Sequence, residues 1–268
     1  MKERRYKKKR NKGRIAAALL ALICLGTAAF FAGRLWYEKQ EYQKGDDTYD
    51  LLRELATVEE PEESGSSPIM GQESENEDNT GEGISIDLDA LGEVNEEIRA
   101  WLYSPDTVID YPVCQGEDNS YYLTHLADGT YNKNGCLFID CGNSGDFSDE
   151  NTVIYGHHMA SGKMFASLIC YADQAYYEAH PVMYLTAAGK QYRLELFSGY
   201  TTTVDSSSYT LSFGSEHEFM EWLREICGKS DFRATTYLTA DDRIVTLSTC
   251  AYSFQDARYV LHGKLVEN

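Results

Sequence analysis

Positive charge is scarce in this sequence outside its first residues. The 268 residues include 24 Lys or Arg against 43 Asp or Glu, which gives a formal net charge of −19 at pH 7. Residues 1–14 hold nine of the basic residues and one Glu, a local charge of +8, so the rest of the chain carries −27. Because wrapping nucleic acid requires clustered cations that neutralise phosphates, the acidic body argues against that function, and we expect no nucleic-acid partner.

Cysteine motifs typical of metal or redox sites are also lacking. None of the seven cysteines forms a CxxC pair, and the spacing of Cys136 and Cys141 fits no strong zinc pattern. Cys24 falls in an apolar run, and the pairing of the other six, if they form disulfides, is not fixed by their spacing. We therefore expect neither a metal nor a cofactor, and we expect most of these cysteines to be small buried hydrophobes.

The glycine and aromatic contents exclude two further classes of protein. Twenty-one glycines are too few for a collagen-like chain, and twenty tyrosines within 12% aromatic residues exclude a wholly disordered one. The length is ample for burying a large core.

One long apolar run follows the basic N-terminus. Residues 15–33 (IAAALLALICLGTAAFFAG) carry no charge, and as a helix rising about 1.5 Å per residue they span roughly 28 Å, close to the hydrocarbon thickness of a bilayer. A cleaved signal peptide is the alternative, but the run continues through Phe30 and Phe31, beyond the small residues 27–29. We predict an uncleaved signal-anchor, with residues 1–14 cytoplasmic and the C-terminal bulk outside.

Composition divides the remaining chain into three parts. Residues 34–56 predict a juxtamembrane helix with a modest apolar stripe. Residues 57–83 are acidic, rich in Ser and Gly and free of Lys and Arg, so they cannot bury enough apolar surface to fold and predict a disordered linker. From residue 84 to residue 268 the composition is that of one globular domain.

Short β-rich runs dominate residues 84–268. About eight of them with few helices indicate a mainly β protein, built as a closed or nearly closed β-barrel. Residues 92–102 (GEVNEEIRAWL) have apolar side chains at helical spacing and predict a short helix before the barrel. Further helical patterns lie near residues 164–177 and at residues 216–227. The runs interpreted as strands are 108–113, 136–140, 152–155, 182–186, 191–201, 243–249 and 257–265.

Two of these strands bring a thiol and a guanidinium together. The strand that begins at residue 243 ends in Cys250, which shares a face with the polar Thr246 and Ser248. Arg258 begins the next strand after a short loop. If the two strands are antiparallel partners, Cys250 and Arg258 flank the same loop.

A third strand ends in histidine. Residues 151–158 (NTVIYGHH) lead through Gly156 into His157. Acyl transfer from a peptide requires a nucleophile, a proton donor for the leaving amine and a group that holds the oxyanion. A thiol, an imidazole and a guanidinium have these properties. Cys250, His157 and Arg258 are therefore the candidate catalytic residues.

These segments resemble the sortase family. The resemblance rests on TLSTC ending at Cys250, on Gly156-His157 after an apolar strand, and on Arg258 eight residues after the cysteine. It covers roughly residues 84–268 and implies an eight-stranded β-barrel transpeptidase with an N-terminal helix, anchored by one membrane helix in Gram-positive bacteria. Further stretches are similar to class B sortases: residues 95–101, 107–113, Gln115, 118–123, 135–140, and the helix 216–227 inserted before the cysteine-bearing strand.

The resemblance also implies a role for each candidate residue. Cys250 would be the nucleophile, His157 the acid and base, and Arg258 the residue that stabilises the oxyanion. Ser248 and Thr249 are candidate substrate contacts, with a purely structural role in the strand as the alternative.

Several neighbouring positions are less clear. Tyr252 stands where some class B members have an acidic residue, so a Cys-His-Asp triad is not supported. His158 follows His157 directly, and the motif favours His157. We interpret the remaining histidines as ordinary surface or core residues, although His262 shares a strand face with Arg258 and could reach the site.

By this resemblance the protein cleaves a C-terminal sorting motif of secreted proteins at a Thr–X bond, forms a thioacyl intermediate on Cys250 and transfers the protein to an amino group of peptidoglycan. The catalytic domain would face the cell wall. One alternative is a pilus-polymerising sortase, which is disfavoured because we find neither a lid-like segment before the barrel nor a second apolar segment at the C-terminus. Others are an exported cysteine endopeptidase that uses water, and a non-catalytic barrel whose Cys250 is buried and unreactive.

Overall fold

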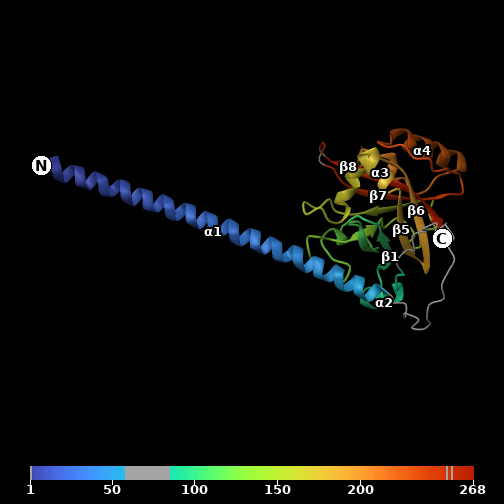
Figure 1. Ribbon diagram of the computed structural model, residues 1–268, viewed down its shortest axis with the longest axis horizontal. Coiled ribbons are helices and arrows are strands. Elements are labelled where there is room, and N and C mark those ends of the chain that lie inside the picture. The colour runs from blue at the N-terminus through green and yellow to red at the C-terminus, as the bar shows by residue number, and fades with distance from the viewer. Residues whose placement is uncertain (1, 58–84, 252, 255) are drawn as a thin grey trace, which may run out of the picture. The chain divides into compact units, whose positions relative to one another are not determined.

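The computed structural model describes residues 2–57, 85–251, 253, 254 and 256–268 (Figure 1). Of the linker expected at residues 57–83, all but Thr57 lies outside the described residues, and so does Tyr252. The chain forms two compact units, one up to Asp46 and one from Asp47 to Asn268.

The first unit is part of one long helix, α1, which runs without a break from Lys2 to Ala56 and so ends within the second unit. Its side chains over the apolar run, such as Leu20 and Phe30, are exposed. The part from Arg14 onward is long enough to cross a membrane, and its most apolar stretch has a mean hydropathy of 2.4. The segments expected as a signal-anchor and a juxtamembrane helix are therefore parts of a single helix.

The second unit is built on a closed barrel of eight strands (Figure 1). Around the barrel the order is β1-β2-β3-β4-β7-β8-β6-β5. Neighbours are antiparallel except for the pairs β2–β3 and β4–β7, which are parallel. The strands are β1 (Ile98–Tyr103), β2 (Asp110–Cys114), β3 (Leu137–Ile139), β4 (Asn151–Tyr155), β5 (Val182–Ala187), β6 (Lys190–Thr203), β7 (Arg243–Cys250) and β8 (Ala257–Glu267).

Alternation of buried and less buried side chains explains why these runs form strands around one interior. In β5 every second residue is buried, as expected for a strand with one face toward a core. In β7 almost every residue is buried, because Val245 and Leu247 belong to the barrel core while Ile244 belongs to a second cluster outside it. The helices around the barrel are α2 (Leu88–Val94), α3 (Gln174–Ala179) and α4 (Glu216–Lys229), with short 3-10 helices η1 (Tyr121–Leu123), η2 (Phe165–Ala172) and η3 (Ser207–Tyr209).

The helix expected at residues 92–102 is wrong over most of its length. The helix α2 ends at Val94, and residues from Ile98 onward form strand β1 between β2 and β5. The adjacent Trp101 and Leu102 are both buried, so both faces of β1 are covered. A short run that is apolar on both faces has no period of two, and such a run also fits a helix.

The inserted helix expected before the cysteine-bearing strand is α4, which covers the outer surface of the barrel beside β6 (Figure 1). Its N-terminus is capped by Ser215, whose hydroxyl accepts a hydrogen bond from the backbone N–H of Glu218. The buried face of α4 packs on the barrel through residues that form a second apolar cluster: Phe197, Tyr200, Phe219, Trp222, Leu223, Ile226, Ile244 and Val260.

The end of α1 belongs to the same compact unit as the barrel. Tyr49, Leu52 and Ala56 are buried in the barrel core cluster. The Arg53 guanidinium binds the carboxylate of Asp110 in β2 at 2.5 Å and the backbone carbonyl of the same residue at 2.8 Å. The compact unit thus includes residues 47–56, which lie before the globular domain expected from residue 84.

Candidate active site

A cavity of about 510 Å³ opens where strands β4, β7 and β8 come together. It contains all five residues expected at the site, which come from three separate stretches of sequence. Its lining consists of Asn119, Leu123, Phe138, Tyr155, Gly156, His157, Val204, Tyr209, Ser248, Thr249, Cys250 and Arg258.

The ends of β7 and β8 place the thiol beside the guanidinium. Cys250 is the last residue of β7, and Arg258 is its direct partner in the antiparallel ladder. Cys250 is a free thiol and is partly exposed. The alternative of a non-catalytic barrel expected Cys250 to be buried, and its partial exposure disagrees with that expectation.

The parallel pairing of β4 with β7 brings the histidine to the same end. Tyr155, the last residue of β4, pairs with Ser248, and the N–H of Gly156 donates to the carbonyl of Ser248 at 3.0 Å. Residue 156 must be small, because a Cβ there would lie 2.5 Å from Leu137 Cδ2. The chain therefore passes close to β3 and leaves the barrel at His157.

One hydrogen bond fixes the tautomer of His157. Its Nε2 lies 2.7 Å from the backbone carbonyl oxygen of Leu123. Because a carbonyl oxygen only accepts, Nε2 carries the proton in this contact, and Nδ1 is left as the nitrogen that can take up or release a proton. His157 is partly exposed and lines the cavity.

His158 points elsewhere. Its Nδ1 lies 3.0 Å from the backbone carbonyl oxygen of Cys250, and its backbone forms an isolated bridge with Met164. It is absent from the cavity lining given above. His158 thus contacts the backbone of the cysteine.

The hydroxyls of Ser248 and Thr249 are both engaged within the protein. Thr249 Oγ1 donates to the carbonyl of Gly156 at 2.8 Å, and Ser248 Oγ lies 2.9 Å from the hydroxyl of Tyr209. Each residue is only 2% exposed. Their contribution to the cavity wall is therefore mainly steric, and Thr249 also links the strand that carries Cys250 to the segment that carries His157.

Tyr209, which the sequence analysis did not single out, couples to the site electrostatically. Burial raises the pKa of its hydroxyl, and the thiol of Cys250 raises it further, whereas Ser248 and the positive charge of Arg258 lower it. Its ring stacks on that of Tyr155, with 6.2 Å between the ring centroids. Tyr209 lies in the short helix η3, where no periodic pattern marks it, so no sequence signal was available.

The carboxylate of Asp140 holds two residues of the cavity lining, Tyr155 and Asn119. Asp140 accepts hydrogen bonds from the hydroxyl of Tyr155 at 2.8 Å and from Nδ2 of Asn119 at 2.9 Å. Asn119 in turn accepts a hydrogen bond from the N–H of Cys141. Burial, and then the hydrogen bond to Asp140, raise the pKa of Tyr155. Asn119 falls within the stretch 118–123 that carried the resemblance, although no role was assigned to it.

His262 does not reach the cavity. It is fully buried beneath α4, where its ring lies 5.9 Å from that of Trp222, and its Nδ1 is 2.9 Å from the hydroxyl of Thr246. His262 shares a strand face with Arg258 but is not at the site, because α4 covers β8 from Val260 to His262. Burial lowers the pKa of His262 to about 3, with a smaller contribution from Lys229.

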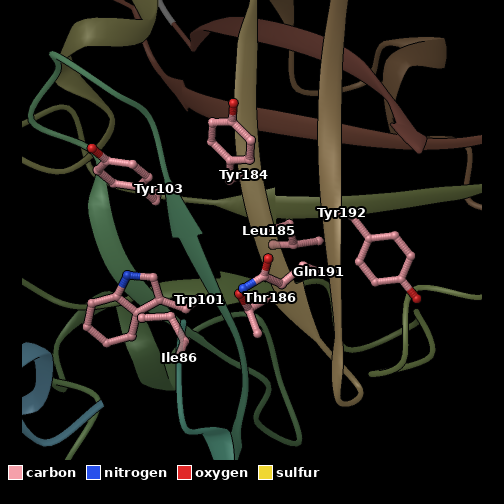
Figure 2. A pocket seen from close by; sticks show the side chains of 8 residues that line it. All are labelled: Ile86, Trp101, Tyr103, Tyr184, Leu185, Thr186, Gln191 and Tyr192. Atoms are coloured by element: carbon pink, nitrogen blue, oxygen red, sulfur yellow. The ribbon is translucent and has the colours of Figure 1, made fainter. Parts of the chain in front are cut away.

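A smaller hollow lies between β1, β5 and β6 (Figure 2). It encloses only about 10 Å³, roughly the smallest space that can hold one water, between the side chains of Trp101, Tyr103 and Tyr184. Within the described part of the chain, no three His, Cys, Asp or Glu side chains are grouped so that they could hold a metal ion.

Comparison with known proteins agrees with this geometry. Residues 102–266 match the Sortase domain family. Sortase B of Listeria monocytogenes is 30% identical over 249 residues, which cover 92% of this chain and 95% of the relative.

Solved structures give the same result. A Bacillus anthracis protein described as similar to sortase B superposes with a TM-score of 0.69 and 34% identity, covering 85% of this chain and 98% of that one. The Staphylococcus aureus sortase B–substrate complex has a TM-score of 0.64 and 32% identity, covering 67% and 84%. The chain therefore belongs to the sortase family of cysteine transpeptidases, and within that family to class B.

Proposed function

We propose that this sortase cleaves a C-terminal sorting motif of secreted proteins at a Thr–X bond and joins the new C-terminus to an amino group of peptidoglycan. One observation carries the proposal: Cys250 and Arg258 face each other across β7 and β8, and His157 lines the same cavity. These three residues supply a nucleophile, a permanent cation and a proton carrier.

In the first half-reaction the thiol of Cys250 gives its proton to Nδ1 of His157, and the sulfur attacks the carbonyl carbon of the threonine in the motif. A C–S bond forms, the carbonyl oxygen becomes an oxyanion, and the C–N bond then breaks. The leaving amine takes a proton from Nδ1 of His157, because Nε2 is already committed to the carbonyl of Leu123. The product is a thioester between the threonine and Cys250.

In the second half-reaction an amine attacks the thioester. His157 takes a proton from this amine, a C–N bond forms, the C–S bond breaks, and the thiolate of Cys250 is regenerated. The solved neighbours include an S. aureus sortase B bound to a substrate and a sortase B bound to triglycine. These two complexes support a sorting peptide and an amine as the two substrates of this chain.

Arg258 would stabilise the oxyanion in both half-reactions. Arg258 is partly exposed and pairs directly with Cys250 in the ladder. Its guanidinium donates a hydrogen bond to the carbonyl of Ala257 at 3.0 Å. A fixed positive charge next to a developing negative charge lowers the energy of the transition state more than that of the substrate.

We further infer that α1 anchors the enzyme in the cell membrane as a single span, with the N-terminus cytoplasmic and the barrel facing the cell wall. Support comes from the length and hydropathy of the helix after Arg14 and from the basic residues of the first fourteen positions.

The test is a transfer assay with the full-length chain in detergent micelles. The substrate is a peptide library in which threonine occupies each position in turn. The enzyme is given this library together with triglycine, with a peptide that has a free lysine side chain, or with no added amine. Mass spectrometry identifies the products. We expect cleavage after threonine and transfer to the triglycine amine. Preferred transfer to the lysine side chain would instead indicate a pilus-polymerising enzyme, and hydrolysis in all three reactions would indicate an endopeptidase.

A further inference from the structure

The last turns of helix α1 contact Gly135, a residue that lies against the ring of His157. The hydroxyl of Tyr49 donates a hydrogen bond to the backbone carbonyl of Gly135, which precedes strand β3. Tyr49 is only 3% exposed, and its ring packs edge-on against that of Tyr111 at 5.3 Å. The contact joins segments 86 residues apart in the sequence.

Gly135 lies directly against the ring of His157. A Cβ at this position would be 2.9 Å from Cδ2 of His157 and 2.6 Å from the carbonyl oxygen of Tyr122. The backbone φ of Gly135 is +60°, a conformation that favours glycine. The ring of His157 therefore has no room to move toward this residue, and any displacement of Gly135 changes the space available to the ring.

The hydrogen bond that orients His157 comes from the same small region. A Cβ on Gly135 would also be 3.0 Å from the carbonyl oxygen of Leu123, the acceptor for Nε2 of His157. The next residue, Cys136, donates its N–H to the carbonyl of Tyr122 at 2.9 Å. Gly135, Tyr122 and Leu123 thus form a continuous backbone support under the imidazole, and we call these three residues the histidine support.

Helix α1 contacts this support at Gly135, through the hydroxyl of Tyr49. The helix is fixed to the barrel independently by Arg53, which binds Asp110, and by the buried Leu52. The contact between Arg53 and Asp110 involves none of the three residues of the histidine support. Docking of the helix and contact with the support are therefore separable by mutation.

We propose that Tyr49 is a positioning residue for catalysis: its hydroxyl holds the carbonyl of Gly135, and through Gly135 it holds the imidazole of His157 in the orientation that proton transfer requires. This inference rests on the proposed function, because it takes His157 as the acid and base. Loss of the hydroxyl leaves a buried carbonyl without its partner, which favours a shift of Gly135 toward another donor or water. A shift of the support moves the ring and its Nε2 acceptor together.

The experiment compares Tyr49→Phe with Arg53→Gln in the full-length chain in micelles. Both variants weaken the attachment of the same helix, but only Tyr49→Phe removes a contact with the histidine support. We expect Tyr49→Phe to lower kcat about tenfold with KM nearly unchanged, since misplacement of a catalytic group by a fraction of an ångström has effects of this order. Arg53→Gln should lower the melting temperature and leave kcat close to that of the wild type.

A readout that a purely structural role would not move is the titration of His157 itself. The rate of alkylation of Cys250 as a function of pH, and the NMR titration of the His157 Cε1 proton, should both shift in Tyr49→Phe and stay unchanged in Arg53→Gln. All assays are run well below the lower of the two melting temperatures and are normalised to the titrated fraction of reactive Cys250.

The outcomes separate this inference from the proposed function. If His157→Ala transfers peptide at the wild-type rate, the proposed function is wrong and Tyr49 has no catalytic residue to position. If His157→Ala is inactive but Tyr49→Phe matches Arg53→Gln in kcat and in both titrations, the positioning role of Tyr49 is overturned while the proposed function stands.

Discussion

Arg258 lies directly opposite Cys250 in the antiparallel ladder between β7 and β8. The last residue of β7 and the second residue of β8 thus meet at the end of the barrel where the cavity opens. Since β4 runs parallel to β7, the segment that follows β4 delivers His157 to the same end. The register of three neighbouring strands is enough to gather the three candidate catalytic side chains.

From this relationship we expect Arg258→Ala to lower kcat by about 10²–10³ with a smaller effect on KM, because removing one group that stabilises an oxyanion costs this much. Arg258→Lys keeps the charge but loses the planar guanidinium, so it should restore only part of the rate. The measurement is kcat together with the melting temperature of each variant. A normal kcat in well-folded Arg258→Ala would remove the arginine from the mechanism.

The cysteines provide a second prediction, because their environments differ sharply. Cys250 is partly exposed, whereas Cys114 and Cys136 are buried, with their sulfur atoms 3.6 Å apart. Burial also raises the pKa of the Cys114 thiol, which makes it less nucleophilic. Iodoacetamide should therefore modify Cys250 in the native protein and leave Cys114 and Cys136 unmodified until the chain is unfolded.

The same labelling reports on activity. Transfer of peptide should be lost in proportion to the modification of Cys250, and Cys250→Ala should show neither cleavage nor a covalent acyl-enzyme. Mass spectrometry of tryptic peptides distinguishes this site from the exposed Cys141, Cys170 and Cys227. Full activity after complete modification of Cys250 would exclude it as the nucleophile.

Much of the barrel and the candidate site was predictable because their signals are local. In the sequence of β7 apolar and polar residues alternate from Val245 to Ser248 before Cys250, and Arg258 and Gly156-His157 stand at the ends of apolar runs. Tyr209 and Asn119 were not predicted as site residues, because they reach the cavity through a short 3-10 helix and a loop whose course depends on the completed barrel.

Strand β1 and helix α1 show where local patterns fail. Trp101 and Leu102 are both buried because β1 is covered on both sides, and this removes the alternation that marks a strand. The docking of Tyr49 on Gly135 depends on contacts between distant segments, and nothing in residues 34–56 taken alone indicates it.

Replacing glycine by alanine should have opposite effects on the stability of the protein at Gly156 and at Gly228. A Cβ on Gly156 would lie 2.5 Å from Leu137 Cδ2 and 2.6 Å from Phe165 Cδ2, so Gly156→Ala should destabilise the protein by about 1–3 kcal/mol through overpacking. A Cβ on Gly228, near the end of α4, meets no atom within 4 Å, so Gly228→Ala should raise stability by up to about 1 kcal/mol. Urea unfolding of both variants measures the difference. Equal free energies of unfolding for the two variants would contradict the close approach of the backbone to β3.

The last prediction concerns the buried His262 and the pH dependence of stability. The hydroxyl of Thr246 donates to Asn151, so the 2.9 Å contact with His262 is donated by Nδ1–H of the imidazole. Within the described part of the chain, Nε2 has no hydrogen-bond partner among protein atoms, and a second proton there would place an unpaired charge beneath α4. This agrees with the low folded-state pKa of about 3, caused mainly by burial.

The sign of the effect follows from comparing the two states of the chain. In the unfolded chain His262 titrates near its ordinary pKa of about 6.5, so between pH 6.5 and 3 the unfolded state binds a proton that the folded state does not. The stabilisation is complete above pH 6.5 and is lost as the pH falls, by up to about 1.4 kcal/mol per pH unit. His262→Gln should therefore flatten the slope of unfolding free energy between pH 6.5 and 4.5. The exposed His217, which pairs with Glu221 on α4, provides the control, because His217→Gln should leave the slope unchanged. Urea unfolding at several pH values gives both slopes, and equal slopes for His262→Gln and the wild type would mean that His262 can be protonated inside the fold.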